Sequence, residues 1–374
     1  MKIAILSTAT GQGHNAAAMA LKERFISMGC EVLLADLLNM GGNSGSKRAS
    51  KTYETAITKA PHVFRTFYEL GWLIDSQVRH SPVYYANATH AEGVLKELNA
   101  FTPEAVLCTH MFGAHIMTYL SVKYSYSPFC VGVMTDYTPT PLWAETRCDF
   151  YITPSPLLNG SFEKSGLPAS KLLPFGIPVA ERFRSRLSKA EAKSRFGLNE
   201  KPVVAIIGGS MGFGAISSIC RALRENLPEV QVVAVCGHNK KAFDAVSAVK
   251  GVIPTEFIGN VDELIDATDV LLTKPGGLTT SEAINKAVPL VLTNPIPGCE
   301  EANARFLSAN GLAIATFSPA DAAKAARRLL ENAEDCEKMS AAQKLFTQND
   351  ACSDICSAVL KKVEDNKQIQ MQNV

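Results

Sequence analysis

Residues 2–28, KIAILSTATGQGHNAAAMALKERFISM, contain a complete strand, turn and helix pattern. Lys2–Ser7 is an apolar run of the length of a buried strand, and residues 8–15 hold the glycines and polar side chains of a turn. From Ala16 to Met28, apolar side chains recur on one helical face. Such a unit is the usual opening of a parallel sheet that is covered by helices on both faces.

The same pattern begins again at residues 202–223, PVVAIIGGSMGFGAISSICRAL. Here Pro202–Ile207 predicts a strand, Gly208–Gly214 a glycine turn and Ala215–Leu223 a helix. Further strands are predicted at Glu31–Asp36, Ala105–Cys108, Phe129–Met134, Phe150–Thr153, Val230–Cys236, Glu256–Gly259, Val270–Thr273 and Leu290–Thr293. The repeated opening predicts two α/β, Rossmann-like domains with parallel sheets that face each other across a cleft. We place them at residues 1–176 and 177–345, followed by a C-terminal helix and polar tail at 346–374.

The composition excludes several classes of protein. The 374 residues are 47% hydrophobic and 20% charged, which is a globular balance, and 37 basic against 36 acidic residues give no global field for nucleic acid. The ten cysteines include no CxxC pair, so free thiols in the cytosol are expected. No signal peptide and no apolar run of about 18 residues is apparent, so we expect a cytoplasmic protein that can still lie on a membrane surface.

Residues 41–90 interrupt the alternation of strands and helices. Basic side chains outnumber acidic ones there, and aromatic side chains lie among them; the basic residues are Lys47, Arg48, Lys51, Lys59, Arg65 and Arg79, and the aromatic ones include Phe64, Phe67, Tyr68 and Trp72. One interpretation is a pair of core helices with a solvated basic edge. The other is a surface that faces a membrane or accepts a lipid.

Two turns in the second half are suited to phosphate. Gly208–Gly214 and Thr273–Glu282 each follow a strand and open a helix, where glycines and free N–H groups can approach an anion. Thr279 and Thr280 add hydroxyls in the first turn of the second helix. Glu282 could hold a ribose diol, or it could be a capping acid near the helix dipole. With Glu300 and Asn303 at a third helix start, the set suggests a nucleotide that carries a polar group, such as a nucleotide sugar.

In the first half, His14 lies on a glycine-rich turn near a helix N-terminus. Burial and the positive end of the helix dipole favour the neutral imidazole that a general base requires, although a single histidine can equally be structural. Asp136, after the strand Phe129–Met134, is a second candidate base or an orienting carboxylate. The chain contains no Asp-x-Asp, so we expect helix dipoles rather than a metal ion to stabilise a departing diphosphate.

The order of these stretches resembles a known family of glycosyltransferases over roughly residues 1–330. The matching segments are Gly11–His14, Val133–Tyr137 with Trp143, Phe175–Pro178, Val235–Lys241, Phe257–Asn260, Thr273–Glu282 and Pro297–Asn303. The chain is similar to the enzymes that make monogalactosyldiacylglycerol in plastids and processive glucosyldiacylglycerols in bacteria. It resembles, more distantly, the N-acetylglucosaminyltransferase of lipid II synthesis.

The resemblance implies a GT-B fold and inverting transfer, without a cofactor or essential metal, from a UDP-sugar in the C-terminal domain to diacylglycerol at the N-terminal domain. It implies a catalytic role for His14, and contacts to the donor from Gly208, Gly209, Ser210, Ile258, Gly259, Thr279, Thr280, Glu282, Glu300 and Asn303. Phe64, Phe67 and Trp72 are the expected acceptor or membrane contacts, at an anionic surface on the cytoplasmic face of the plasma membrane. Where the family usually has Gln, this chain has Cys299, so the sugar is left open between glucose and galactose.

Three alternatives remain at this point. The chain could transfer sugar to another lipid, such as an undecaprenyl-linked sugar. It could be a UDP-sugar epimerase, which shares the two-domain architecture. It could also be a lipid-binding protein that only retains the scaffold, an interpretation that His14 and Glu282 argue against.

Overall fold

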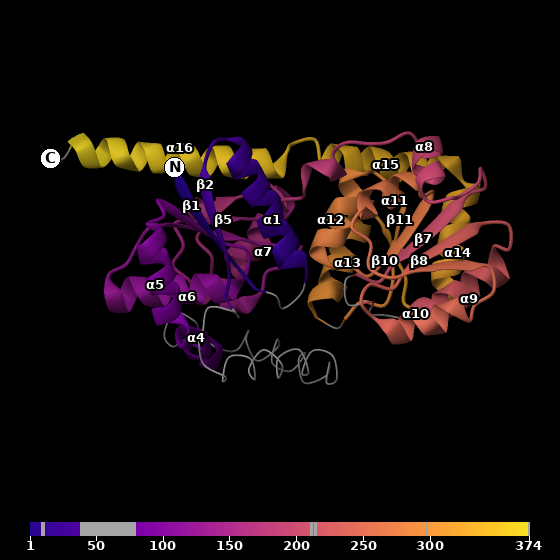
Figure 1. The fold of residues 1–374 in the computed structure, drawn as a ribbon, viewed down its shortest axis with the longest axis horizontal. Coiled ribbons are helices and arrows are strands. Elements are labelled where there is room, and N and C mark those ends of the chain that lie inside the picture. The colour runs from indigo at the N-terminus through magenta and orange to yellow at the C-terminus, as the bar shows by residue number, and fades with distance from the viewer. Residues whose placement is uncertain (9–11, 38–79, 210–211, 213–214, 297, 373–374) are drawn as a thin grey trace. The chain divides into compact units, whose positions relative to one another are not determined.

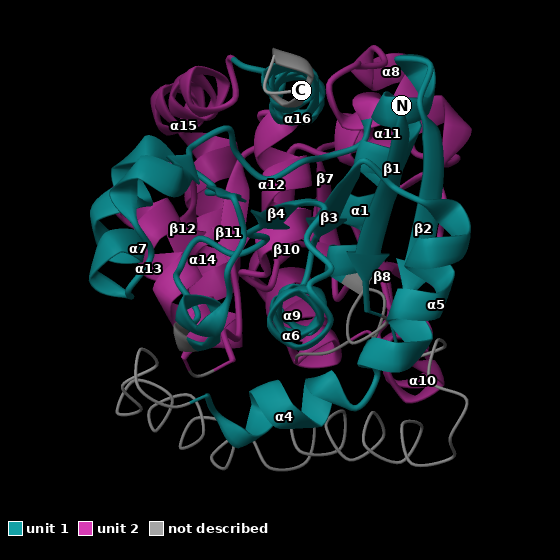
Figure 2. Ribbon diagram, turned by 90° about the vertical axis from the view of Figure 1, so that its left-hand side faces the viewer, with its two compact units in different colours: residues 1–180, 349–374 teal, residues 181–348 magenta. Residues whose placement is uncertain are grey.

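The computed structural model describes residues 1–8, 12–37, 80–209, 212, 215–296 and 298–372. The chain divides into two compact units, residues 1–180 with 349–374, and residues 181–348 (Figure 2). The sequence prediction placed the joints after residues 176 and 345, and the structure has them after residues 180 and 348.

The described part of the first unit is built on a six-stranded parallel sheet in the order β2-β1-β3-β4-β5-β6 (Figure 1). The strands are β1 (Lys2–Ser7), β2 (Glu31–Asp36), β3 (Ala105–Cys108), β4 (Phe129–Val133), β5 (Phe150–Ile152) and β6 (Leu172–Leu173). The α-helices are α1 (Gln12–Ser27), α4 (Pro82–Ala88), α5 (Ala91–Phe101), α6 (Met111–Tyr124), α7 (Asn159–Lys164) and α16 (Ala351–Gln372). Short 3₁₀ turns lie at Pro141–Glu145, Pro156–Leu158 and Ala169–Lys171.

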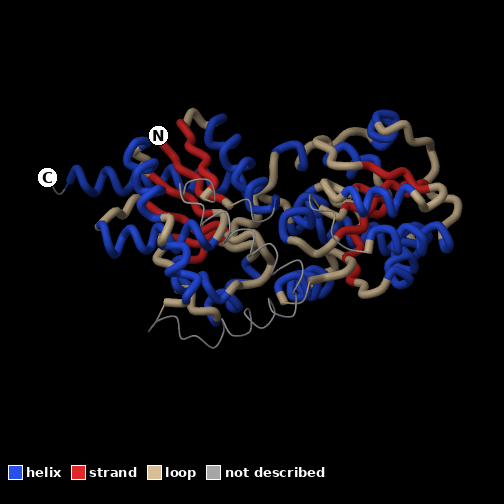
Figure 3. Tube along the Cα trace, turned by 60° about the horizontal axis from the view of Figure 1, so that its bottom comes forward, coloured by secondary structure: helices blue, strands red, loops and turns tan. Residues whose placement is uncertain are grey.

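The second unit has a parallel sheet in the order β12-β11-β10-β7-β8-β9. Its strands are β7 (Val203–Ile207), β8 (Gln231–Val235), β9 (Val252–Thr255), β10 (Val270–Thr273), β11 (Leu290–Leu292) and β12 (Ile314–Ala315). Its α-helices are α8 (Lys189–Arg195), α9 (Ile216–Asn226), α10 (Lys240–Ser247), α11 (Val261–Ala267), α12 (Gly277–Asn285), α13 (Cys299–Ala309), α14 (Pro319–Glu331) and α15 (Ala333–Phe346), with a 3₁₀ turn at Glu181–Phe183. In each unit the strands lie inside a shell of helices (Figure 3).

The apolar runs explain why the strands form where they do. Every residue of β3, β7 and β10 is buried, as expected for central strands of a sheet that helices cover on both faces. The predicted α/β class with two doubly wound parallel sheets is therefore confirmed.

One predicted strand is wrong. Residues Glu256–Gly259 are a loop, and the strand in this region is β9, which ends at Thr255. β9 contains Pro254, and proline cannot donate to a ladder. It is tolerated because β9 is an edge of its sheet.

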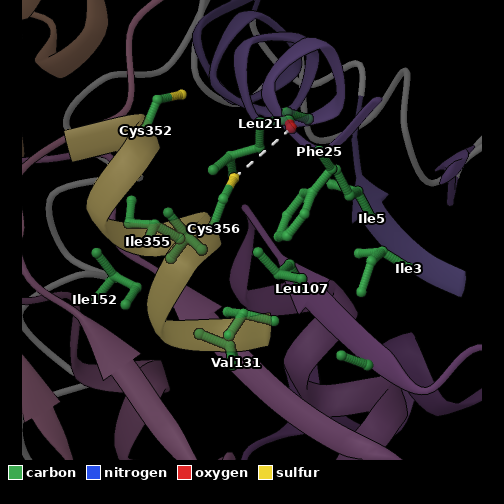
Figure 4. Packing of buried hydrophobic residues seen from close by; sticks show 14 of the residues in the cluster. Ile3, Ile5, Leu21, Phe25, Leu107, Val131, Ile152, Cys352, Ile355 and Cys356 are labelled. Atoms are coloured by element: carbon green, nitrogen blue, oxygen red, sulfur yellow. Dashed lines mark hydrogen bonds between the residues drawn. The ribbon is translucent and has the colours of Figure 1, made fainter. Parts of the chain in front are cut away.

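The C-terminal helix α16 packs on the first unit rather than on the residues that precede it. Cys352, Ile355 and Cys356 belong to the same buried cluster as Ile5 of β1 and Phe25 of α1 (Figure 4). The helix continues to Gln372, through most of the segment that the sequence predicted as a polar tail. All ten cysteines, including Cys352 and Cys356, are free.

Candidate functional site

The first candidate site lies where the strand order of the first sheet reverses. β1 has β2 on one side and β3 on the other, so the loops after β1 and β3 lead away in opposite directions. In open α/β sheets such a switch point at the carboxyl ends of the strands is the usual place for a ligand. His14 follows β1 and Thr109 follows β3, and both lie at this point.

The imidazole of His14 is held by groups from two other loops. Its Nδ1 lies 3.1 Å from the carbonyl oxygen of Thr109 and 2.8 Å from Oγ1 of Thr135. Because a carbonyl oxygen can only accept, Nδ1 carries the proton and donates it to Thr109. In the neutral ring this leaves Nε2 with an unshared lone pair.

Burial favours this neutral ring. It lowers the pKa of His14 below the ordinary value of 6.5, while the carboxylate of Asp136 and the bond to Thr109 act in the opposite direction. The structure thus brings the two predicted residues, His14 and Asp136, into electrostatic contact. Helix α1 begins at Gln12, four residues earlier than predicted, so His14 lies in its first turn rather than before it.

The sequence analysis missed two neighbours of His14. Thr135 precedes the predicted Asp136, and His110 begins helix α6, where its Nδ1 accepts from the N–H of Phe112 at 3.2 Å. The ring of His110 lies edge-on to that of His14, with centroids 4.5 Å apart. Burial, followed by the proximity of His14, holds the pKa of His110 well below 6.5. A Thr-His pair directly after the strand Ala105–Cys108 was the signal that could have identified this position.

The second candidate site lies at the switch point of the second sheet, between β7 and β10. Gly208 and Gly209 leave β7 here, and a Cβ on Gly208 would lie 2.5 Å from Cδ1 of Ile216 and 3.1 Å from Cα of Gly212, so a larger residue would require these neighbours to shift. Gly209 has a φ of +69°, a conformation that glycine adopts readily. Ser210, the third predicted residue of this turn, lies outside the described residues.

The predicted turn after β10 opens helix α12, with Gly276 as its N-cap. The hydroxyl of Thr280 is buried and donates within the helix, to the carbonyl oxygens of Gly276 at 2.6 Å and Gly277 at 3.0 Å. Thr279 is half-buried and is therefore the more accessible of the two predicted hydroxyls.

Glu282 is the sixth residue of α12, and the first turn of this helix holds no acidic residue, so the capping alternative is wrong. Burial raises the pKa of the half-buried Glu282 to about 8; Arg182 lowers it and Asp262 raises it further. Arg182 forms an ion pair with Asp262 at 3.6 Å. The described residues give the carboxyl of Glu282 no hydrogen-bond partner.

The predicted pair Glu300 and Asn303 lies on α13 and is tied to the turn after β10. Asn303 Nδ2 donates to the carbonyl oxygen of Pro275 at 3.0 Å, and Glu300 Oε1 lies 2.6 Å from Nζ of Lys274. Lys274 was not among the predicted site residues, because only the N–H groups and hydroxyls of that turn were taken as phosphate contacts. A lysine directly after a strand at a phosphate-type turn was the signal.

Ile258 and Gly259 lie in the loop between β9 and α11. Beside them, the ring of Phe257 is 51% exposed and stacks on the ring of His238, with centroids 4.7 Å apart and planes 10° apart. These two rings line a hollow of about 330 Å³ together with residues such as Asn239. The stacked rings form an aromatic wall of this hollow, and Phe257 is next to Ile258 in the sequence.

Some predictions lie outside the described residues. These are the aromatic residues Phe64, Phe67 and Trp72, together with the basic residues of segment 41–79. Within the part of the chain that the structure describes, no three histidine, cysteine or carboxylate side chains are grouped as metal ligands would be. None of the helices described is both long and apolar enough to span a bilayer.

Comparison with known proteins gives matches over nearly the whole chain. Residues 14–179 match the family model of monogalactosyldiacylglycerol (MGDG) synthase, and residues 196–346 match that of glycosyl transferases group 1. A processive diacylglycerol beta-glucosyltransferase of Bacillus thuringiensis (strain Al Hakam) is 26% identical over 376 aligned positions, covering 98% of this chain and 95% of the relative.

Solved structures show the same fold. MurG of Acinetobacter baumannii matches with a TM-score of 0.64 at 14% identity, over 96% of this chain and 99% of that one. Alr3699/HepE of Anabaena, solved in complex with UDP-glucose, matches with a TM-score of 0.61 at 14% identity, over 97% of this chain and 100% of that one. The predicted GT-B fold is therefore confirmed, and the chain is similar to the monogalactosyldiacylglycerol synthases over residues 14–179 and, over nearly its whole length, to the processive diacylglycerol beta-glucosyltransferases.

Proposed function

We propose that this protein is an inverting glycosyltransferase that moves glucose or galactose from a UDP-sugar to the hydroxyl of diacylglycerol. The names of its relatives support this acceptor. The observation that carries the proposal is the imidazole of His14, which is neutral and has its proton on Nδ1. A base at an acceptor hydroxyl needs such a ring, with an unprotonated nitrogen available at neutral pH.

In the proposed reaction, Nε2 of His14 accepts the proton of the diacylglycerol hydroxyl. The hydroxyl oxygen forms a bond to the anomeric carbon while the bond between that carbon and the diphosphate oxygen breaks. The imidazolium that results is stabilised by the Thr109 carbonyl, which already accepts from Nδ1, and by the charge of Asp136. UDP leaves with the bonding electrons.

The second unit would hold the donor. Main-chain groups of Ile258 and Gly259 would meet the uracil, and Glu282 would accept from the two ribose hydroxyls. The diphosphate would lie on the glycine turns and helix starts, and the sugar near α13. The residues proposed for the diphosphate are Gly208, Gly209, Ser210, Thr279 and Thr280, and those for the sugar are Glu300 and Asn303.

We propose that no metal ion takes part. The chain lacks Asp-x-Asp, and helix N-termini each provide roughly half a positive charge for a departing diphosphate. Activity is expected to survive excess EDTA. Complete loss that magnesium restores would contradict this part of the proposal.

We further propose that the protein acts at an anionic membrane on its cytoplasmic face, through the aromatic and basic side chains of segment 41–90. Each basic residue near an anionic leaflet is worth about 1 kcal/mol at low salt. The protein is expected to sediment with anionic vesicles and to be partly released by high salt. A folded Phe67→Ser/Trp72→Ser variant that binds and glycosylates vesicles normally would move the contact elsewhere.

The central test is UDP release from UDP-glucose, UDP-galactose and UDP-N-acetylglucosamine, each with and without vesicles that contain diacylglycerol. We expect release with one of the two hexose donors, dependent on diacylglycerol, and a glycolipid product. Release that requires an undecaprenyl-linked acceptor would contradict the proposed acceptor. Conversion of UDP-N-acetylglucosamine without release of UDP would identify an epimerase instead.

A further inference from the structure

Lys274 lies at the switch point of the second sheet, between the two glycine turns. It is the first residue after β10, whose Thr273 is paired in register with Ile207 of the neighbouring β7. A Cβ built on Gly209 would lie 3.6 Å from Cε of Lys274, and one on Gly276 would lie 3.9 Å from its Nζ. The ammonium group therefore stands beside both turns that open toward this edge of the sheet.

The partner of Lys274 is itself held in place. Glu300 Oε1 lies 2.6 Å from Nζ of Lys274, and Oε2 accepts from the N–H of Ile296 at 3.0 Å. The side chain of Glu300 is 10% exposed, whereas that of Lys274 is 29% exposed. The carboxylate is thus the anchored member of the pair, and the lysine is the member that solvent can reach.

A second lysine on the same unit shows what a purely structural pair looks like. Lys286 is 2% exposed and its partner Asp266 is 4% exposed. Nζ of Lys286 donates both to Asp266 and to the carbonyl oxygen of Ser185, each at 2.6 Å. An ammonium has three N–H donors. Among the described residues, Lys274 meets one acceptor, Glu300, and these residues offer no acceptor to its other two donors.

We propose that Lys274 binds the diphosphate of the donor and that Glu300 orients the ammonium between the glycine turns before the donor arrives. A helix N-terminus offers about half a charge, whereas the leaving UDP gains a full negative charge, which a lysine can meet as a point charge. One donor of Lys274 stays on Glu300 and the other two are available to phosphate oxygens. This inference rests on the proposed function, because it takes UDP as the ligand.

The test compares UDP with uridine, which lacks the diphosphate, by titration calorimetry. In Lys274→Met the affinity for UDP is expected to fall by about 10-fold to 100-fold, the effect of one hydrogen bond between charged groups. Uridine affinity is expected to stay within about twofold, since the diphosphate is the group affected. Lys274→Arg, which keeps the charge, is expected to retain most of the UDP affinity.

The matched control is Lys338→Met. It breaks a pair of the same length, 2.6 Å to Glu334, in which both side chains are at least 70% exposed. UDP affinity is expected to be unchanged in this variant. A loss of UDP affinity equal to that of Lys274→Met would overturn the assignment, because the effect would then be one of general charge.

Glu300→Gln separates a phosphate contact from mere support of Glu300. If Lys274 only positions Glu300, both single variants bind UDP normally, and that result overturns the inference. If Lys274 meets the phosphate and Glu300 orients it, Glu300→Gln lowers UDP affinity by less than Lys274→Met does, because the ammonium is still present. If Lys274→Met fails to fold because the carboxylate of Glu300 is left unpaired, the double variant Lys274→Met/Glu300→Gln replaces it. The double variant removes both charges and is expected to lose the same UDP affinity.

UDP affinity in the variants and in the unaltered protein distinguishes failure of this inference from failure of the proposed function. UDP binding of native strength in folded Lys274→Met overturns this inference and leaves the proposed function standing. Failure of the unaltered protein to bind UDP overturns the proposed function, and this inference with it.

Discussion

The two sheets of this protein place chemically different groups at the same topological position. At the first switch point, between β1 and β3, stands the imidazole of His14; at the second, between β7 and β10, stand the glycine turns and Lys274. The strand orders of the two sheets differ. One strand, β2, lies between β1 and the sheet edge, whereas two strands, β8 and β9, lie between β7 and the sheet edge. The switch point of each sheet therefore determines where the candidate site lies, and the residues of the adjoining loops determine which chemical groups the site contains.

His14 and Glu282 also differ in the hydrogen-bond partners that the described residues give them. Burial favours the neutral form of both His14 and Glu282, lowering one pKa and raising the other to about 8. His14 has partners in Thr109 and Thr135, whereas the described residues offer none to the carboxyl of Glu282. A base must be oriented before the acceptor arrives, while a carboxyl that holds a ribose obtains its partners from the ligand.

Replacing the proposed base, His14, is expected to have the largest effect. His14→Ala should lower turnover by about 10²–10⁴-fold, the usual contribution of a general base, while UDP affinity hardly changes. Steady-state kinetics and calorimetry measure the two quantities. Near-normal turnover would remove the assignment and make Asp136 the candidate base.

The carboxyl of Glu282 is expected to reduce the stability of the folded protein at high pH. Because the folded pKa of Glu282 is raised from 4.5 to about 8, the folded state holds its proton more tightly, so stability falls as pH rises between these values. Glu282→Gln, which cannot ionise, should therefore exceed the unaltered protein in stability by on the order of 2–4 kcal/mol above pH 8 and match it near pH 4.5.

Thermal unfolding without ligand at several pH values measures this difference. Glu334→Gln, in which a 73% exposed carboxylate is replaced, is the control and should show no such trend. A constant difference between Glu282→Gln and the unaltered protein across the range would contradict the raised pKa.

The carboxyl of Glu282 is expected to lower the stability of the free protein but to strengthen the binding of UDP. If Glu282 accepts from the ribose diol, Glu282→Ala should weaken UDP binding by about 1.5–3 kcal/mol above pH 8, where the carboxyl is ionised, as for hydrogen bonds to a charged group. Calorimetry on the folded variant measures the loss. Unchanged affinity would show that the ribose lies elsewhere.

The smallest effect is expected at Thr135, which contacts the proposed base, His14. Thr135→Val removes the hydroxyl that lies 2.8 Å from Nδ1 of His14 but keeps the carbonyl of Thr109. A loss of about 0.5–1.5 kcal/mol, or roughly 2-fold to 13-fold in turnover, is expected, with a shifted acid limb of the pH–rate profile. A profile identical to that of the unaltered protein would limit Thr135 to a packing role.

Much of the fold could be predicted because its signals are local. Lys2–Ser7, Glu31–Asp36 and Val270–Thr273 form strands with the predicted bounds, since a buried parallel strand needs only a short apolar run. The error at Glu256–Gly259 has the same origin, because Phe257 and Ile258 are apolar without forming a ladder. Only the pairing of β8 with Val252–Thr255 identifies the edge strand.

The features of the candidate site also divide into those that local sequence predicts and those that depend on tertiary structure. The sequence by itself determined the two glycine turns, the placement of His14 near a helix start and the acids of the second half, because these depend on residue type and on the alternation of strands and helices. Tertiary structure decided that the carbonyl of Thr109, 95 residues from His14, fixes its tautomer, that Lys274 meets Glu300, and that Glu282 is buried enough to raise its pKa. Each of these depends on strand order and helix packing, which bring distant residues together and which no local pattern encodes.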